Sequence, residues 1–344
     1  MAYFKRTMSI FGIVLTFTIT VWAFSGCGES NPYIPTPTPG PNVAWNFLVY
    51  LDGDNDLETQ AIMDFNEMEF IGSNSQVNVL VLFDRHPDYD YSNGDWTGTR
   101  LYRVNYDTNS NVINSQLLAD YGEKDMSDPA TLRDFIIYCQ TYYPAGHTVL
   151  TLWNHGAGVY PKAFEIDKTK STASDSTSAK GICWDDTSGP RPWNCLTTDE
   201  VAAALAAART STGQKIDIIN LDACLMQLLE VAYEWKEQAD FLVGSEETIP
   251  GDGDDYDTVL GHLTGNPNVT SRDLAIQLVT DYYNYYNNAW SNTTYSALDL
   301  AAITGFMPAF QTLATELKLA FADQETSRDV IYTAGTQCTY FIPR

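Results

Sequence analysis

Residues 215–226, with the sequence KIDIINLDACLM, decide which fold this chain can adopt. The run from Ile216 to Leu221 is mostly apolar and rich in β-branched side chains, which is typical of a strand buried on both faces, as in a parallel sheet. After it, apolar residues at 225, 228, 229 and 232 have the spacing of a helix face. We therefore expect Cys224 between the carboxyl end of a buried strand and the amino end of a helix. Open α/β sheets place ligand sites at that edge, and a helix N-terminus favours a thiolate.

A second buried run ends in a histidine. Residues 147–153 (HTVLTLW) lead into Asn154, His155 and Gly156. Because the carboxyl ends of parallel strands meet at one edge of the sheet, we expect His155 near Cys224. A thiol and an imidazole placed together at such an edge are the components of nucleophilic catalysis, and the glycine lets a ligand approach the backbone closely.

The rest of the chain alternates between strand and helix patterns, which predicts an α/β fold. We expect a three-layer sandwich in which a mostly parallel sheet of about six strands is flanked by helices. Further strands are predicted at 45–51, 77–83, 100–106, 240–244 and 296–300, and helices at 57–71, 129–143, 201–209, 271–290 and 305–322. Thr197 and Glu200 have the spacing of a capping box before the third of these helices.

The chain is acidic, with 44 Asp and Glu against 19 Lys and Arg and a formal net charge of −25. This balance argues against nucleic acid as a partner, which requires clustered basic residues, and it favours cationic substrates. The six cysteines contain no CxxC pair, so neither a zinc ribbon nor a thioredoxin-like site is expected.

The first 26 residues have the features of a bacterial signal peptide. Lys5 and Arg6 precede an apolar stretch that ends in Ser25, Gly26 and Cys27. Small residues before a cysteine predict cleavage and lipidation at Cys27, although a plain signal peptide or a membrane anchor remains open. Residues 27–42 are a Pro/Thr-rich tether before a domain that begins near residue 43. We expect a protein of the bacterial cell envelope, periplasmic or surface-exposed, that touches the membrane only through its lipid.

Two further segments leave alternatives open. The acidic stretch from Asp52 to Asp56 suggests a calcium loop, but Leu57 stands where an EF-hand requires glycine, so a strand-to-helix turn with Asp56 as N-cap fits better. Residues 158–195 are expected to form a polar inserted loop, accessible to proteases, in which Cys183 and Cys195 could be disulfide-bonded. The predicted strand at 338–344 has no closing element, which leaves open whether the domain is complete at this end.

Several blocks of the chain together resemble clostripain-type cysteine peptidases, relatives of the caspases, legumains and gingipains. They occur in collinear order over roughly residues 44–300: WNFLVYLDGDNDLE, LTLWNHGAG, GICWDDT, DIINLDACLMQLLEVAYE and the stretch ending in IPG. The resemblance implies a caspase-like fold in which Cys224 is the nucleophile and His155 the general acid and base. It also implies an oxyanion hole formed by the backbone N–H groups of Gly156 and Cys224.

The same resemblance implies an endopeptidase that cleaves peptides and proteins after Arg or Lys. Asp222 would select the basic side chain and Asp252 would form a second wall of its pocket; the alternatives are a helix N-cap for Asp222 and a plain turn residue for Asp252. Family members are often zymogens, and Lys168 and Lys170 are our candidates for self-cleavage. The chemistry needs no cofactor, and calcium is possible by resemblance, with no ligand set evident in the sequence.

A second class of function also fits these patterns. The same fold without activity would be a surface lipoprotein that binds peptides or calcium. The presence of both His155 and Cys224 favours the enzyme.

Overall fold

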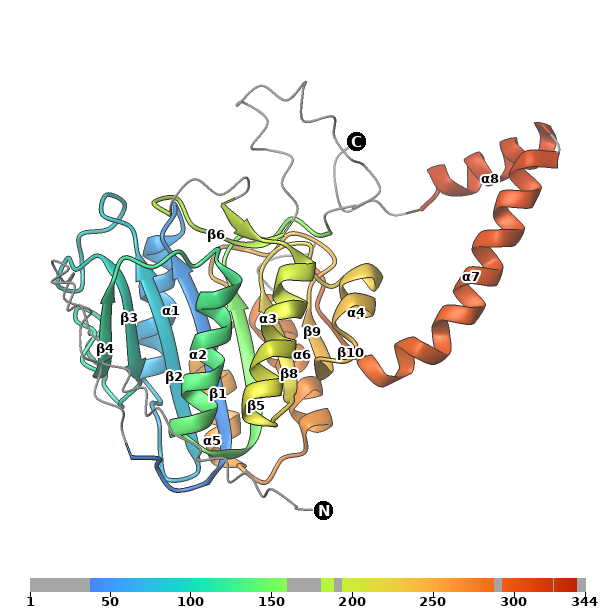
Figure 1. Ribbon diagram of the computed structural model, residues 1–344. Coiled ribbons are helices and arrows are strands. Elements are labelled where there is room, and N and C mark those ends of the chain that lie inside the picture. Colours follow the sequence, from blue (N-terminus) through green and yellow to red (C-terminus); the bar gives the residue numbers. More distant parts are fainter. Residues whose placement is uncertain (1–37, 160–180, 189–193, 288–292, 324, 339–344) are drawn as a thin grey trace, which may run out of the picture. The chain divides into compact units, whose positions relative to one another are not determined.

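The computed structural model describes residues 38–159, 181–188, 194–287, 293–323 and 325–338 (Figure 1). The predicted signal peptide, most of the tether and the lipidation site Cys27 lie outside the described residues, as do Lys168 and Lys170. Within the described part of the chain, no helix has both the length and the apolar character needed to cross a membrane.

The centre of the fold is an eight-stranded sheet with the order β10-β9-β8-β5-β1-β2-β3-β4. The five central strands β9, β8, β5, β1 and β2 pair in parallel, whereas β10 and the β3–β4 hairpin pair antiparallel at the two ends. The predicted α/β class is confirmed, but the sheet has more strands than the six expected. The strands are β1 (Val43–Gly53), β2 (Val77–Arg85), β3 (Gly98–Arg103), β4 (Gln116–Gly122), β5 (Ala145–Trp153), β8 (Ile216–Asp222), β9 (Ala239–Gly244) and β10 (Ser296–Asp299).

Helices cover both faces of this sheet, which gives the predicted three layers (Figure 1). One face carries α2 (Pro129–Tyr142), α3 (Thr198–Thr212) and α4 (Leu229–Trp235); the other carries α1 (Glu58–Glu69), α5 (Tyr256–Gly265) and α6 (Ser271–Tyr286). The side chains of strand β1 point to both helix layers. Phe47 stacks edge-on against Tyr256 of α5, whereas Tyr50 packs on Phe135 of α2. This two-sided burial explains why the central strands are continuous apolar runs.

The predicted inserted loop contains a buried hairpin. Strands β6 (Ile182–Trp184) and β7 (Cys195–Leu196) pair antiparallel, and Gly156 forms an isolated bridge to Ile182. Cys183 and Cys195 are both buried, and these two described residues are thiols with no disulfide between them. The segment that follows the predicted cleavage region is therefore part of the core and packs beside His155.

The chain ends in two helices, α7 (Leu300–Asp323) and α8 (Glu325–Thr336). Leu300 and Ile303 are buried at the start of α7, whereas later apolar residues such as Phe306 and Leu313 are exposed. The predicted strand at 338–344 falls almost wholly outside the described residues.

Candidate active site

His155 and Cys224 are brought together by adjacent strands. The backbone N–H of Asn154, directly after β5, donates to the carbonyl of Asp222 at the end of β8, at 3.2 Å. His155 is the residue after Asn154, and Cys224 lies two residues after Asp222. A Cβ atom added to Gly156 would overlap the carbonyl oxygen of Cys224 and lie 2.9 Å from Cγ of Met226. The structure thus places the His155–Gly156 backbone against Cys224, which is the arrangement that the topology predicts.

The imidazole of His155 is oriented by a carboxylate that the sequence pattern did not identify. Its Nε2 atom lies 2.8 Å from Oδ1 of Asp56, and both side chains are substantially exposed, at 43% and 67%. The prediction that Asp56 is the N-cap of α1 is wrong, because the helix begins at Glu58 with Leu57 at the cap position. With Nε2 engaged by Asp56, Nδ1 is the ring nitrogen left to exchange a proton with a reacting group.

The segment before His155 is fixed by a side-chain amide. Oδ1 of Asn154 accepts from the backbone N–H groups of His155 and Trp184. Nδ2 of Asn154 donates to the carbonyl of Asp52 at 2.7 Å. One buried side chain therefore joins the ends of β1, β5 and β6, and its hydrogen bonds leave the histidine loop little freedom.

The thiol of Cys224 is held in its neutral form. Burial raises its pKa, and the charges of Asp222 and Glu247 act in the same direction, against a backbone hydrogen bond from Ile249 that lowers it. That N–H group lies 3.3 Å from Sγ. The prediction that a helix N-terminus activates the thiol is wrong, because α4 begins only at Leu229 and Leu225 has a positive φ of 63°. Deprotonation of Cys224 therefore requires a base such as His155.

Asp222 lies beneath the loop that follows β9. It is 3% exposed, and its Oδ2 atom accepts from the backbone N–H of Asp254 at 3.1 Å and from the hydroxyl of Tyr256 at 2.9 Å. Gly253 has a positive φ of 58°, and a Cβ atom there would lie 2.6 Å from the same oxygen. Asp252, predicted as the second wall of the pocket, is exposed. The second buried carboxylate beside Asp222 belongs to Asp254.

Burial and mutual repulsion separate the pKa values of these two acids. Burial raises the pKa of Asp222 to about 6, against hydrogen bonds from Asp254 and Tyr256 that lower it. Burial and the charge of Asp222 raise the pKa of Asp254 to about 8. At neutral pH the carboxyl group of Asp222 is therefore the more ionised of the two, and that of Asp254 the more protonated.

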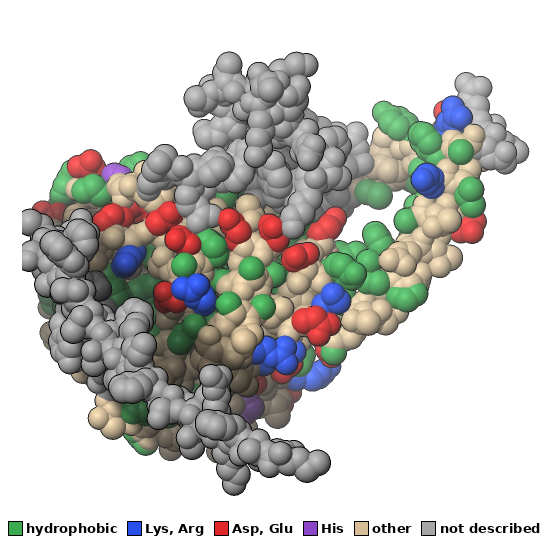
Figure 2. Space-filling model, viewed as in Figure 1, with side chains coloured by type: hydrophobic (Ala, Val, Ile, Leu, Met, Phe, Trp, Pro, Cys, Tyr) green, Lys and Arg blue, Asp and Glu red, His purple; other side chains and the backbone are tan. Residues whose placement is uncertain are grey.

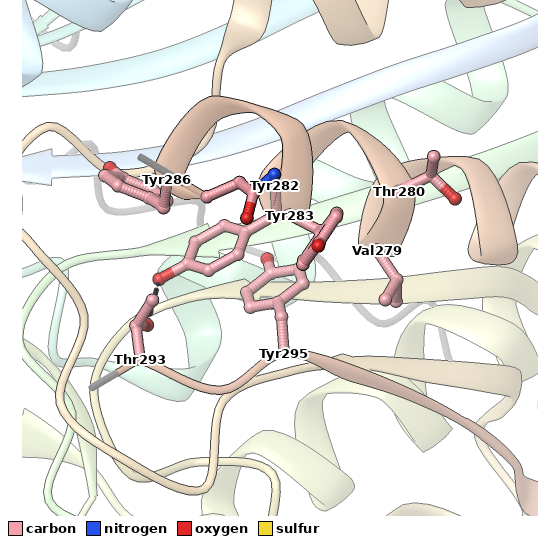
Figure 3. A pocket seen from close by; sticks show the side chains of 8 residues that line it. Val279, Thr280, Tyr282, Tyr283, Tyr286, Thr293 and Tyr295 are labelled. Carbon is pink, nitrogen blue, oxygen red and sulfur yellow. Dashed lines mark hydrogen bonds between the residues drawn. The ribbon is translucent and has the colours of Figure 1, made fainter. Parts of the chain in front are cut away.

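An aromatic pocket of about 460 Å³ adjoins this acidic pair (Figure 3). Its walls come from α6 and from the segment before β10, where Tyr282 and Tyr295 stack at 4.0 Å. The Tyr295 hydroxyl lies 3.2 Å from Oδ2 of Asp254, and the hydroxyl of Tyr286 donates to the carbonyl of Gly253 at 2.6 Å. The tyrosine-rich stretch DYYNYY was the available sequence signal for this pocket.

A second acidic group lies at the same edge of the sheet, where Figure 2 shows Asp and Glu side chains gathered. Single carboxylate oxygens of Asp54, Asp84, Glu123 and Asp185 all lie within 4.8 Å of one another. These are the described residues that fit a hard divalent cation, because such ions prefer clustered carboxylate oxygens. The four residues come from separate segments of the chain, so no local sequence motif could identify them as a group.

Comparison with known proteins identifies the family. Residues 49–340 match the sequence model of the clostripain family, peptidase family C11. The chain belongs to the clostripain family. Clostripain of Hathewaya histolytica is 29% identical over 243 residues, which cover 66% of this chain and 43% of that protein. The chain thus matches less than half the length of this curated relative.

Solved structures support the fold of this clostripain-family chain. A secreted C11 cysteine protease from Bacteroides thetaiotaomicron, solved with an irreversible peptide inhibitor, has a TM-score of 0.60 and 24% identity over 78% of this chain and 69% of its own. An inactive zymogen C11 protease from Parabacteroides distasonis has a TM-score of 0.56 and 22% identity over 83% of this chain and 69% of its own. The caspase-like arrangement expected from the sequence is thereby confirmed as the fold.

Proposed function

We propose that this protein is a cysteine endopeptidase that cleaves after Arg or Lys with a Cys224–His155 dyad. Membership of the clostripain family places the chain among cysteine peptidases. The observation that carries the residue assignment is the hydrogen bond from Asn154 to Asp222, which sets the two strand ends side by side.

The proposed reaction begins with proton transfer from Sγ of Cys224 to His155, since burial keeps the thiol protonated. The thiolate attacks the carbonyl carbon of the substrate, and the backbone N–H groups of Gly156 and Cys224 stabilise the oxyanion. His155 then gives its proton to the leaving amine, which breaks the C–N bond and leaves a thioester. Water, deprotonated by the same imidazole, hydrolyses the thioester and restores the thiol.

The proposed preference for basic residues rests on Asp222. Its carboxylate is buried, ionised at neutral pH and bonded to two neutral donors, Asp254 N–H and Tyr256 OH. A guanidinium or ammonium group entering this site would gain a charge-assisted hydrogen bond in an environment with little competing water. The neighbouring aromatic pocket would contact another side chain of the same substrate.

Self-processing and envelope attachment complete the proposal. Cleavage after Lys168 or Lys170 would occur between the histidine and cysteine blocks of the sequence, and the structurally characterised zymogen of the same fold makes such a step reasonable. We further propose that lipidation of Cys27 holds the enzyme at the bacterial envelope, where it meets extracytoplasmic peptides and proteins.

The decisive experiment compares the wild-type protein with Cys224→Ala on fluorogenic peptides ending in Arg, Lys, Asp or Ala. We expect cleavage after Arg and Lys that disappears in the variant, together with loss of any cut between residues 158 and 195. Cleavage that persists in Cys224→Ala would contradict the nucleophile assignment. Stoichiometric peptide binding by both proteins without cleavage would instead support a silent peptide-binding lipoprotein.

A further inference from the structure

The order of the strands sets the direction in which a substrate crosses the candidate active site. Cys224 follows β8 and His155 follows β5, whereas β9 and β10 lie on the opposite side of β8 from β5. In the proposed reaction the leaving amine receives its proton from His155. The substrate residues after the cleaved bond therefore lie on the β5 side, and the residues before it extend across the ends of β9 and β10.

The aromatic pocket between α6 and the segment before β10 lies on this second side (Figure 3). Tyr295, which lines the pocket, directly precedes β10. The hydroxyl of Thr294, the residue before it, accepts from Glu247 N–H at 3.3 Å. The carbonyl of Glu247 in turn accepts from the N–H of Leu225, the residue after Cys224, at 3.1 Å. Two hydrogen bonds thus connect the pocket wall to the segment that carries the nucleophile.

The walls of the pocket are apolar although they are built largely from tyrosines. The hydroxyl groups of Tyr282, Tyr286 and Tyr295 are each hydrogen-bonded to other protein atoms, so the rings remain as the contact surface. No acidic or basic side chain is among the described residues that line the pocket. Its volume of about 460 Å³ lies within the range of pockets that bind ligands. Aromatic walls of this kind favour a large apolar or aromatic group.

The pocket is also close to the buried carboxylate proposed to bind the basic side chain. Asp254 connects them, because its N–H donates to Oδ2 of Asp222 at 3.1 Å and its own Oδ2 lies 3.2 Å from the hydroxyl of Tyr295. In an extended peptide, side chains two residues apart point to the same side at a spacing of about 7 Å. One short substrate segment can therefore occupy both places.

On the basis of the proposed peptidase activity, we propose that this pocket binds a large apolar or aromatic side chain that precedes the basic residue of the substrate. The protein would then select a combination of two features: a positive charge at the cleaved bond and an apolar side chain on its amino-terminal side. An acidic side chain is disfavoured in the pocket, because Asp222 and Asp254 lie nearby and no cation lines its described walls.

The test uses fluorogenic peptides that end in Arg. Each of the three residues before Arg is varied in turn among Ala, Leu, Phe and Glu, with Ala at the other two positions. At one of these positions we expect kcat/KM for Phe or Leu to exceed that for Ala by about tenfold or more, the effect of burying one large apolar side chain. Glu at the same position should be cleaved more slowly than Ala.

Two substitutions connect such a preference to the pocket. Tyr283→Ala removes part of a wall, and Val279→Phe fills the cavity. Tyr283 is 60% exposed and Val279 is half-buried, so the fold should survive both changes, which melting curves verify. In each variant the Phe-to-Ala ratio should fall to about threefold or less. Tyr233→Ala is the control, because this exposed tyrosine belongs to α4 on the other face of the sheet, and it should leave the ratio unchanged.

Cleavage after Arg with no preference at the three positions would overturn the pocket proposal and leave the proposed peptidase intact. A preference that both pocket variants retain would do the same. If no peptide is cleaved, the proposed function fails, and the pocket is tested by calorimetry on the full chain carrying Cys224→Ala. The peptide with Phe should then bind at least tenfold more tightly than its Ala counterpart, and Val279→Phe should abolish the difference. Equal affinities for the two peptides would refute the pocket assignment.

Discussion

Replacement of Asp222 by Asn is the sharpest test of how the proposed peptidase selects its substrate. In the wild-type protein, Asp254 N–H and Tyr256 OH donate hydrogen bonds to Oδ2 of Asp222. The side-chain oxygen of Asn can accept the same two hydrogen bonds. The fold should therefore survive, and the main change is the loss of one buried negative charge. A hydrogen bond to a charged group is worth about 1.5–3 kcal/mol, and breaking a buried ion pair costs about 3–5 kcal/mol.

These values predict the size of the effect. We expect kcat/KM for a substrate ending in Arg to fall by about a hundredfold, within a range of roughly tenfold to a thousandfold. A peptide ending in citrulline has nearly the same shape without the charge, so its kcat/KM should change by about threefold or less. The ratio of the two rates isolates the charge from any general damage to the site.

Asp254→Asn is the matched control. Because burial and the charge of Asp222 raise the pKa of Asp254 to about 8, its side chain is already mostly neutral at pH 7, and Asn resembles that state. Its Arg-to-citrulline ratio should fall far less than that of Asp222→Asn. An unchanged ratio in Asp222→Asn, or an equal loss in both variants, would refute the assignment of Asp222 as the selector.

The pH dependence of the same ratio gives an independent check. The pKa of Asp222 is raised to about 6, so the carboxylate is charged above that pH and becomes neutral as the pH falls through it. The preference for Arg over citrulline should therefore be constant above pH 7 and decline as the pH falls below about 6. Changes in the reacting groups with pH affect both substrates equally and cancel in the ratio. A preference unchanged down to pH 4.5 would exclude Asp222 as its source.

Three further predictions follow from particular contacts. Asp56→Ala should lower kcat/KM by about fivefold or less, because the Asp56–His155 pair is largely exposed and such pairs are worth about 1 kcal/mol or less; a loss above a hundredfold would make Asp56 a full third catalytic member. Gly156→Ala should lower kcat/KM by about a hundredfold or more, since its Cβ would collide with the Cys224 carbonyl, and near-normal activity would contradict the placement of this backbone. Cys27→Ala should move the protein from the membrane fraction to the soluble fraction of expressing cells, and an unchanged distribution would argue against a lipid anchor.

The central strands were predictable because burial on both faces leaves a continuous apolar run. Strands β1, β2, β5, β8 and β9 all have this signature. Strand β4 does not, because it lies at the edge of the sheet and most of its residues are exposed or half-buried. It was missed for that reason, and it is one of the strands by which the sheet exceeds the expected number.

The helix predicted directly after Cys224 shows where apolar spacing fails. Met226 is fully buried and Leu228 is partly buried, but both belong to a loop whose residue Leu225 has a positive φ. The backbone of this loop bonds to Ser245 and Glu247 and not within a helix. Of the apolar positions on which the prediction rested, 225 and 228 lie in this loop, whereas 229 and 232 lie in α4, and only Ala232 is fully buried. Local chemistry at the start of α3 was more reliable, because Thr197 N–H donates to Glu200 Oε2 at 3.0 Å, as the capping box predicts.

The proximity of His155 and Cys224 followed from topology, whereas their surroundings did not. Parallel strands place their carboxyl ends together, so two strand-end residues could be paired from sequence alone. The contacts of Asp56, Asp254 and the carboxylate cluster depend on how loops between distant segments fold over that edge, and no periodicity encodes such contacts. The acidic stretch 52–56 was noticed, but its partners near residues 84, 123 and 185 are unrelated to it in sequence.

Some of the acidic residues that give the chain its negative charge are buried in the folded protein. Five acidic residues are buried at one edge of the sheet in two groups: Asp222 with Asp254 on the β8 side, and Asp54, Asp84 and Asp185 on the β1 and β2 side. Burying like charges costs several kcal/mol per ion unless a partner compensates it, and the donors recorded for these carboxylates are neutral apart from the distant His86. Without a compensating positive charge, this burial would only lower the stability of the fold. The expectation of cationic ligands, drawn first from net charge alone, is the basis for proposing that a basic side chain of the substrate binds at the buried carboxylate of Asp222.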